Sequence, residues 1–318
     1  MNSTGKVTVL GINGHIGHAA AVAFAAAGWQ VTGFGRSNKQ PIAGTKFIRG
    51  DAESVIEMAA AIADADVVVN ALNLPYHQWD NGRMEAQAER VIQAMGTSRK
   101  AMLFPGNIYN YAASQRLITP DAPQRPETQR GAIRVRTENL LKAAADRGAF
   151  QLIIIRAGDF YAPNNGMDWF DNAILREAGK GKVAEMAPHG IRHSWAYLPD
   201  LGRAFEKLAW HRGELGQVEN FHFAGHFVDS AEMTAAIQAA APVPLKVGAA
   251  PWGMIKVMGL AMPVMREVSK MRYLWRNTME LKDLRLDAIL GADFGTPFQE
   301  AVRQVTMPFF EKAVAKAA

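Results

Sequence analysis

The chain has 318 residues, of which 49% are hydrophobic and 20% charged, with a formal net charge of +5 and no cysteine. These values describe an ordinary globular protein with one large α/β unit or about two domains. The absence of cysteine excludes disulfides, thiolate metal sites and cysteine nucleophiles, and we expect no bound metal. The sequence contains no block of like charges, signal segment or long apolar run, which predicts a cytoplasmic protein that contacts neither nucleic acid nor membrane.

A glycine-rich stretch follows the first predicted strand. The apolar run Val7–Leu10 leads into this stretch, and an alanine-rich helix follows it. Gly11 permits a tight turn, Gly14 lets the backbone approach a diphosphate, and Gly17 lets the helix pack closely on its strand. The free N–H groups and the dipole of the helix start favour negative charge there. The stretch therefore predicts a dinucleotide-binding site made by Gly11, Asn13, Gly14, His15, Ile16 and Gly17.

The residues after the second predicted strand, 29–34, favour one form of the cofactor. Gly35, Arg36, Ser37 and Lys39 follow this strand, with no acidic residue among them. An acid about 20 residues after the glycines usually binds the free ribose of NAD, whereas Arg and Ser suit a 2′-phosphate. Arg36 and Ser37 therefore predict a preference for NADP(H). NAD(H) stays an alternative, because Arg36 and Lys39 are also typical of solvated loops.

Further strands are predicted to end at the same edge of the sheet. Alternating strands and helices, with a β-branched run at residues 66–70, predict an α/β protein with a doubly wound parallel sheet, a Rossmann fold. Asp51 follows the third strand and either contacts the adenine or caps the next helix. Asn70, Ala71 and Leu72 end the fourth strand and are predicted to line the middle of the cofactor.

Aromatic and polar side chains follow the fourth and fifth strands. The loop after the fourth strand contains Tyr76, His77 and Trp79, which we interpret as substrate contacts, with an ordinary structural loop as the alternative. After the fifth strand, Pro105–Tyr111 leaves the sheet where active sites of this architecture form.

A helix is predicted over residues 131–147, with Arg134 and Glu138 four residues apart and Arg130 in the same register just before it. Side chains at this spacing lie on one face of a helix. Residues 150–156 then form the sixth predicted strand.

The order of these segments resembles the extended and atypical short-chain dehydrogenase/reductases, the superfamily of NAD-dependent epimerases and dehydratases. The resemblance covers about residues 5–300. It rests on the GxxGxxG spacing of Gly11 to Gly17, Asn107-Ile108-Tyr109 as the end of a "VYG" segment, residues 156–163 as an "RPxxxYGP" segment, and residues 193–201 as a strand-to-helix junction. It implies a dinucleotide-binding domain over residues 1–163. Residues 164–318 then form a smaller substrate-binding lobe, interleaved with the sheet.

The sequence departs from this family at three catalytic positions. The family's Tyr and Lys fall on Arg130 and Arg134, and its Ser falls at about Pro105. Arg134 can supply the fixed charge of the missing Lys and contact the cofactor, whereas Arg130 stays charged and cannot donate a proton. We expect Tyr109 to act as the acid, with its pKa lowered by the arginines, and Asn107 to polarise a carbonyl. Tyr111, on the same loop, is the other near candidate for the acid, and His193 and Tyr76 are reserves.

The remaining chain is predicted to complete a pocket for a small, partly apolar carbonyl or hydroxyl substrate. Tyr111, Trp169 and Trp195 are its candidate aromatic contacts. A helix is expected over residues 169–179, and Asp200 is expected to cap another. His222 is expected to face outward or to be satisfied locally.

Residues 252–268 contain Met254, Met258, Met262 and Met265 on one predicted helical face. This stripe is either core filler or a mobile lid over an apolar substrate. Near the C-terminus, Pro308 is predicted to interrupt the last helix.

Two functions stay open. The first is an NADP(H)-dependent oxidoreductase or epimerase with non-standard catalytic residues. The second is a catalytically silent NADP(H)-binding sensor or regulator, which the loss of the family's Tyr, Lys and Ser favours. The resemblance also suggests a homodimer formed by the helices that begin near Asn81 and Gly131.

Overall fold

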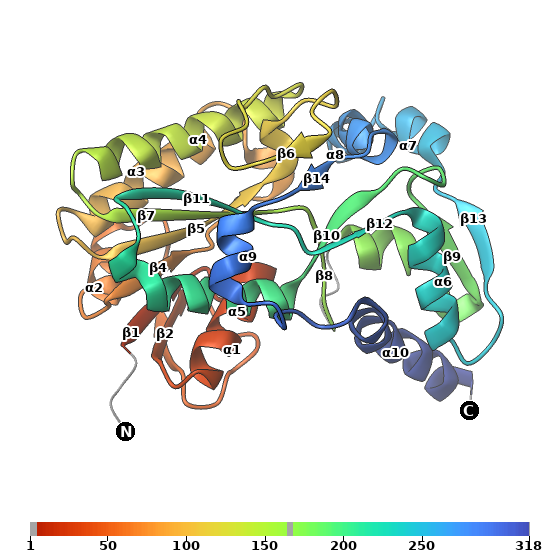
Figure 1. Ribbon diagram of the computed structural model, residues 1–318, viewed down its shortest axis with the longest axis horizontal. Helices are drawn as coiled ribbons and strands as arrows, with labels where there is room; N and C mark the ends of the chain where they lie inside the picture. The colour runs from red at the N-terminus through yellow and green to blue at the C-terminus, as the bar shows by residue number, and fades with distance from the viewer. Residues whose placement is uncertain (1–4, 164–167, 318) are drawn as a thin grey trace.

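A seven-stranded parallel sheet lies at the centre of the protein (Figure 1). The computed structural model describes residues 5–163 and 168–317, with side chains described to residue 311. The strand order is β11-β7-β5-β4-β1-β2-β3, and every pair of neighbours is parallel, which confirms the doubly wound sheet. Its strands are β1 (Lys6–Leu10), β2 (Gln30–Gly35), β3 (Lys46–Arg49), β4 (Val67–Asn70), β5 (Ala101–Asn107), β7 (Gln151–Ala157) and β11 (Val218–Phe223).

Helices cover both faces of this sheet. The sheet's strands contribute apolar side chains to two separate cores, as expected for a parallel sheet that is buried on both sides. One face is covered by α1 (His15–Ala26), α5 (Leu198–Trp210) and α9 (Leu284–Leu290). The other face is covered by α2 (Val55–Ile62), α3 (Arg83–Met95) and α4 (Gln129–Asp146).

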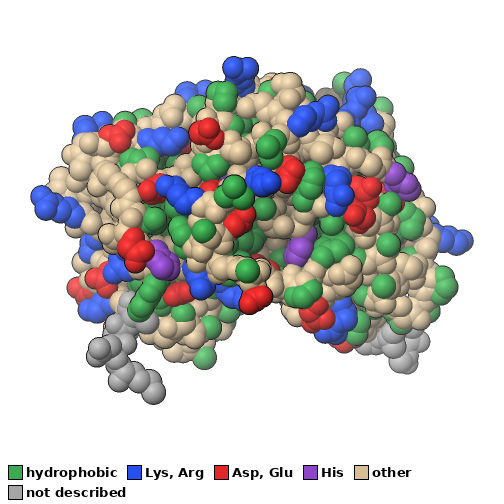
Figure 2. Space-filling model, in the orientation of Figure 1, with side chains coloured by type: hydrophobic (Ala, Val, Ile, Leu, Met, Phe, Trp, Pro, Cys, Tyr) green, Lys and Arg blue, Asp and Glu red, His purple; other side chains and the backbone are tan. Residues whose placement is uncertain are grey.

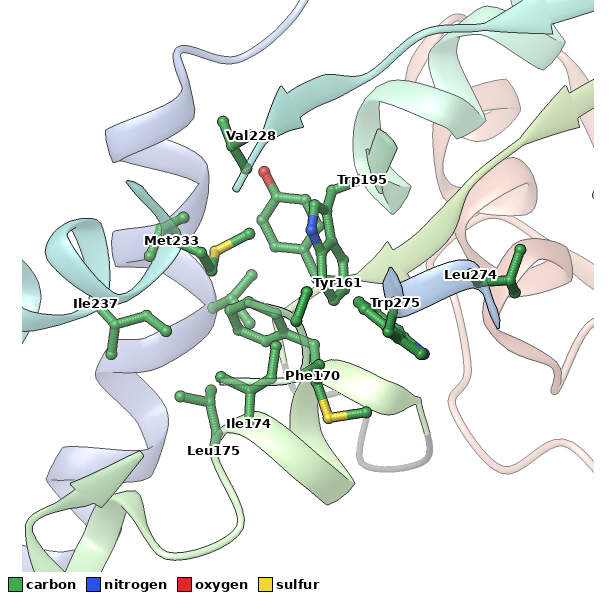
Figure 3. Packing of buried hydrophobic residues seen from close by; sticks show 14 of the residues in the cluster. Tyr161, Phe170, Ile174, Leu175, Trp195, Val228, Met233, Ile237, Leu274 and Trp275 are labelled. Atoms are coloured by element: carbon green, nitrogen blue, oxygen red, sulfur yellow. The ribbon is translucent and has the colours of Figure 1, made fainter. Parts of the chain in front are cut away.

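A second lobe packs beside the carboxyl ends of the strands. It contains the three-stranded sheet β12-β10-β8 and a separate aromatic and aliphatic core, in which Tyr161, Phe170, Trp195 and Trp275 face one another (Figure 3). Its strands and helices are β8 (Asp159–Tyr161), β9 (Lys182–Glu185), β10 (His193–Tyr197), β12 (His226–Val228), β13 (Lys246–Ala249), α6 (Ser230–Ala240), α7 (Trp252–Met258), α8 (Pro263–Lys270) and α10 (Phe298–Ala317). Two short strands, β6 (Leu117–Ile118) and β14 (Glu280–Leu281), pair between the lobes. The predicted domain boundary at 163–164 falls beside residues 164–167, which lie outside the described residues.

Two helix caps differ from the sequence-based expectation. Ser54, and not Asp51, caps α2, because its side chain accepts the N–H of Glu57; Asp51 accepts the N–H of Glu53 in the turn before it. The cap predicted for Asp200 is also wrong, since α5 begins at Leu198. The carboxylate of Asp200 instead accepts both the N–H and the hydroxyl of Thr296, which fixes the segment before α10.

Three helices of the lobe differ from their predictions. The segment expected as one helix over 169–179 is a π-helical turn, η3 (Phe170–Ile174), followed by a short 3-10 turn, η4 (Ala178–Lys180). The segment with the methionine stripe is divided into α7 and α8, because Pro263 starts a new helix. The predicted break at Pro308 is wrong. α10 continues through it because Val305 and Phe310, on either side, are both buried in the core of the lobe.

The core-filler interpretation of the methionine stripe is wrong for three of its four members. Met254, Met258 and Met262 have exposed fractions of 57%, 36% and 45%. Among the helices that the structure describes, none is long and apolar enough to cross a membrane.

Candidate functional site

The glycine turn between β1 and α1 forms a cradle of bare backbone. Gly11 has a φ of +81°, and a Cβ there would lie 2.9 Å from the carbonyl oxygen of Ala71. A Cβ on Gly17 would lie 2.3 Å from the carbonyl oxygen of Gly11, so only glycine allows the helix to start this close to the strand. No side chain caps α1 at Gly14, and the first turn carries no acid. The free N–H groups at this helix start therefore suit a diphosphate.

Asn13 connects this cradle to the loop after β2. Its side-chain amide donates to the carbonyl of Ser37 at 2.5 Å, and its carbonyl oxygen accepts the N–H of Lys39 at 2.9 Å. Arg36 and Ser37 are exposed beside it. Within the described part of the chain, the Arg36 guanidinium makes no ion pair or hydrogen bond. It is free to bind an anionic group carried next to the cradle.

The other predicted cofactor residues end neighbouring strands at this edge. Asn70 is 3% exposed, and its side-chain oxygen accepts the N–H of Leu72 at 3.4 Å, which shapes the turn through Ala71. Burial lowers the pKa of His15, at the start of α1, so its ring is held neutral near the phosphate cradle. Asp51 is exposed at the end of β3. The structure thus brings these predicted cofactor residues to one edge of the sheet.

The predicted row of charges on α4 is buried along one face, as its spacing indicated. Arg130, Arg134 and Glu138 are 3%, 5% and 0% exposed. Arg134 donates to the carbonyl oxygen of Pro105, so the positions that correspond to the family's Lys and Ser lie together. A Cβ on Gly131 would lie 2.1 Å from the carbonyl oxygen of Tyr109, which shows how closely α4 packs on the loop after β5.

Arg130 is neutralised by two carboxylates from distant segments. Its Nη2 atom lies 2.9 Å from Asp80, and its Nε atom lies 3.2 Å from Glu267 on α8. Its guanidinium also lies over the ring of Tyr76, 5.3 Å from the centroid. Arg130 therefore joins the loop after β4 to the helix that covers it.

Glu138 and Arg156 form an ion pair that no local pattern in the sequence predicts. Both side chains are fully buried, and the guanidinium binds the carboxylate at 2.7 and 3.1 Å. Arg156 also donates to the carbonyl oxygen of Asn107 at 2.6 Å. Burial alone would raise the pKa of Glu138, but the adjacent Arg156 outweighs it and lowers the pKa to about 2. The pair fixes α4, β7 and the loop after β5 relative to one another.

The expected effect of the arginines on the tyrosines is wrong. Burial raises the pKa of Tyr109 well above its usual value, and the nearby Tyr76 and Asp159 raise it further. Burial also raises the pKa of Tyr111, and this outweighs the opposing effect of Arg156, whose guanidinium lies 5.3 Å from the ring centroid. Desolvation of a phenolate costs more here than the paired arginine charges recover. Tyr109 and Tyr111 are therefore neutral phenols at physiological pH.

The predicted substrate residues divide by burial. Trp79, Tyr111 and Trp195 are 3%, 0% and 3% exposed, and the Trp79 indole donates to the carbonyl of Leu74. Tyr76 and Trp169 are half-buried, and His77 is exposed. The rings of Tyr76 and Trp79 lie 5.2 Å apart. No predicted site residue lines the cavity of about 530 Å³ that opens between α5, α9 and the start of α10.

A second buried pair, Asp159 and His193, lies in the same region. The carboxylate of Asp159 is 2.8 Å from His193 Nε2, and both side chains are buried. The His193 ring stacks on Trp275 at 4.5 Å, and its Nδ1 atom has no hydrogen-bond partner among the described residues. His193 was a predicted reserve acid, but no local signal in the sequence indicates Asp159 as its partner, because the two residues lie 34 positions apart.

Residues 263–276 form a roof over this cluster. Glu267 of α8 binds Arg130, and the hydroxyl of Tyr273 donates to the carbonyl of Tyr111 at 3.3 Å. Trp275 stacks on His193. The roof therefore contacts each of the three parts of this cluster: α4, the loop after β5 and β10.

Comparisons with known proteins agree with this arrangement. The model of the "NAD dependent epimerase/dehydratase family" matches residues 7–220. No curated protein matches in sequence. Among solved structures, a putative epimerase from Burkholderia cenocepacia J2315 is 17% identical, with a TM-score of 0.76 over 98% of this chain and all of the other. MoeE5 in complex with UDP-glucose and NAD is 16% identical, with a TM-score of 0.74 over 98% of this chain and 100% of the other. The UDP-glucose 4-epimerase from Brucella ovis in complex with NAD is 15% identical, with a TM-score of 0.75 over 96% of this chain and 98% of the other.

Proposed function

Because this chain belongs to the NAD-dependent epimerase/dehydratase family, we propose that it is an NADP(H)-dependent oxidoreductase or epimerase with non-standard catalytic residues. Its substrate is a small, partly apolar carbonyl or hydroxyl compound. The observation that carries the proposal is that a bare glycine cradle and Arg36, which has no partner among the described residues, lie along the same sheet edge as the cluster of Tyr109, Arg134 and Arg130.

The residues at the cradle fit a phosphorylated dinucleotide. The start of α1 offers free N–H groups, and Gly11, Gly14 and Gly17 leave no Cβ in the way of a diphosphate. Arg36 and Ser37 would then hold the 2′-phosphate, since a guanidinium binds phosphate with two parallel hydrogen bonds. Asn13 positions this loop.

The side chains after β5 and on α4 carry out the proposed chemistry. Bound NADPH would supply the hydride. Tyr109 is neutral and donates its phenolic proton to the oxygen of the reduced carbonyl, a role that its raised pKa permits in the direction of reduction. Arg134 supplies a fixed positive charge toward the cofactor, and Asn107 polarises the carbonyl with its amide. Arg130, fixed by Asp80 and Glu267, positions the loop that carries Tyr76.

The charges of the site favour a neutral substrate. Arg130 is paired with two carboxylates and Arg156 with Glu138, so the cluster keeps little positive charge beyond that of Arg134 for a second diphosphate. MoeE5 binds UDP-glucose. The half-buried Tyr76 and Trp169 instead support an apolar body on the substrate of this protein.

A silent NADP(H) sensor is the second candidate. The observation that favours it is that Pro105, Arg130 and Arg134 occupy the positions of the family's Ser, Tyr and Lys, with Arg130 fixed in ion pairs. In this alternative, the cluster would respond to the binding of NADP(H) by a change in structure, and no hydride transfer would take place there.

Turnover measurements separate the two functions. With NADPH and a panel of apolar aldehydes and ketones, Tyr109→Phe should lower kcat about 100- to 10,000-fold without changing the NADPH affinity. Tyr197→Phe, which removes a phenol that donates to Gln304 outside this cluster, is the matched control and should retain turnover. Unchanged turnover in Tyr109→Phe would remove it as the acid. Tight NADPH binding with no hydride transfer across the panel would support the sensor.

The assembly and location are proposed from the family resemblance. We expect a homodimer through α3 and α4 in the cytoplasm, and light scattering of the purified protein tests the dimer directly. A monomeric mass at micromolar concentration would contradict it.

A further inference from the structure

The segment that joins α7 to α8 carries an exposed apolar surface. The side chains at 254, 257 and 258 follow one face of α7, and those at 260, 262 and 264 continue through the turn into α8. Leu260, at the turn, is 86% exposed. We call this surface the α7–α8 tip; its members are Met254, Val257, Met258, Leu260, Met262 and Val264. The other exposed large apolar side chains of the described chain are scattered from Val22 to Leu284, so this concentration marks an interaction surface.

The surroundings of the α7–α8 tip are positively charged. Residues 251–276 contain a single acid, Glu267, which is buried and paired with Arg130 and with Lys270. Lys and Arg side chains gather over α7 and α8 at the upper right of Figure 2. The cations of this segment are Lys256, Arg266, Lys270, Arg272 and Arg276, all exposed.

We infer that the α7–α8 tip docks on an anionic lipid surface, with Leu260 and its neighbours inserted at the level of the headgroups. Short amphipathic helices with apolar side chains on one side and Lys or Arg around them bind in this manner. α7 and α8 have seven and eight residues, too few to cross a bilayer. A second copy fits the surface less well, because an isologous contact would bring the five cations of each copy together. This proposal replaces the sequence-based expectation of no membrane contact.

The position of the tip connects lipid docking to the active site. The tip is continuous with the roof, whose residues Glu267, Tyr273 and Trp275 contact Arg130, Tyr111 and His193. A docked α7–α8 tip therefore places the roof at the lipid boundary. Resting on the proposed function, this assigns the substrate to lipid-soluble carbonyl or hydroxyl compounds that reach the site from the membrane.

Vesicle co-sedimentation tests the docking without any turnover. The protein should sediment with phosphatidylcholine vesicles that contain phosphatidylglycerol, remain soluble with phosphatidylcholine alone, and dissociate as salt is raised. Leu260→Glu should weaken binding about tenfold or more, since the apolar side chain is lost and a negative charge is added. Ile56→Glu on α2 is the matched control, because Ile56 is 83% exposed and remote in sequence from the tip. Its vesicle binding should equal that of the wild type.

Three outcomes would overturn the docking proposal: no binding of the wild type to anionic vesicles, equal binding of Leu260→Glu, or a dimer in solution that Leu260→Glu dissociates. The last outcome would assign the surface to a second copy.

Turnover measurements test the assignment of a lipid-soluble substrate. Leu260→Glu should raise the KM for a long-chain ketone presented in anionic vesicles and leave the KM for a short water-soluble ketone unchanged. An equal effect on both ketones would overturn the assignment of a lipid-soluble substrate. If the wild type binds vesicles but reduces neither ketone, the proposed enzyme function fails while the docking stands.

Discussion

The two halves of the sheet's carboxyl edge are built in different ways. At the ends of β1, β2 and β4, the surface is glycine and backbone, and the charged Arg36 is exposed and unpaired among the described residues. At the ends of β5 and β7, the charged side chains are buried, and Glu138 and Arg156 form an ion pair. The first half is an open receptacle whose shape comes from local backbone. The second is a rigid cluster that depends on partners far apart in the chain.

This difference predicts which kind of substitution disrupts each half. Adding a side chain to the glycine cradle disrupts it, because the neighbouring backbone atoms cannot move out of the way. A cluster of buried ions fails when a side chain is removed, because a charge is left without a partner in a low-dielectric interior. Substitutions in the two halves should therefore separate cofactor affinity from folding stability.

The largest expected effect is from Glu138→Gln, which leaves Arg156 buried without its carboxylate. We expect a loss of about 3–5 kcal/mol in the free energy of unfolding, measured by urea denaturation. Because the pKa of Glu138 is lowered to about 2, its contribution is complete above the usual value of 4.5 and is lost as the pH falls toward 2. Glu300→Gln removes an exposed carboxylate paired with Arg303 and is the matched control, with little change expected. An equal loss of unfolding free energy in both variants would contradict the expected difference between the buried and the exposed ion pair.

A pH effect should come from His222, which the sequence predicted to face outward or to be satisfied locally. The side chain is fully buried, so the outward-facing alternative is wrong. Its Nδ1 atom donates to the carbonyl of Ile118 at 3.0 Å. Burial, with help from Arg156, lowers its pKa from 6.5 to about 3. Between these values the unfolded state binds a proton that the folded state does not, so stability falls as the pH falls, by up to about 1.4 kcal/mol per pH unit.

His222→Asn keeps a donor near Ile118 and removes the titration. Its unfolding free energy should therefore depend less on pH between 6.5 and 3 than that of the wild type. The exposed His189, replaced by Asn in the same way, serves as the control. If the two variants have the same slope as the wild type, His222 does not titrate on unfolding.

In the cradle, Gly17→Ala should weaken NADPH binding about 10- to 100-fold, because its Cβ would lie 2.3 Å from the carbonyl oxygen of Gly11 and force the turn open. Calorimetry measures the change. Gly213→Ala is the control, since nothing lies within 4 Å of its Cβ. Unchanged affinity in Gly17→Ala would mean that this turn does not hold the cofactor.

The smallest effect should be on cofactor selectivity. Arg36→Ala removes one charge-assisted contact and should lower the affinity for NADPH about tenfold while leaving NADH binding unchanged. Lys39→Ala, on the same loop, should change selectivity less. An equal loss for both cofactors in Arg36→Ala would refute the preference for NADP(H).

The fold and the cradle were predictable because their signals are local. The glycine spacing, the β-branched run of β4 and the four-residue spacing on α4 each define an element within about 20 residues. The buried pairs were not predictable. Arg156 reaches Glu138 because α4 packs on β7, and His193 reaches Asp159 because β10 pairs with β8. The pKa of Tyr109 likewise depends on burial by distant segments. Likewise, the methionines of α7 fit a helical face equally well whether that face is buried or exposed.

The single residue between β7 and β8 rules out a clamshell hinge at this point. Gly158 packs so closely on β10 that a Cβ would lie 1.9 Å from the carbonyl oxygen of Ser194. β10 in turn runs directly into α5, where a Cβ on Gly202 would lie 2.4 Å from the backbone of α1. These close backbone contacts fix strands β8 and β10 of the second lobe to the half of the molecule that carries the glycine cradle. A movement that admits substrate past the roof would then be a local displacement of residues 252–276, and its rate would limit how fast substrate enters.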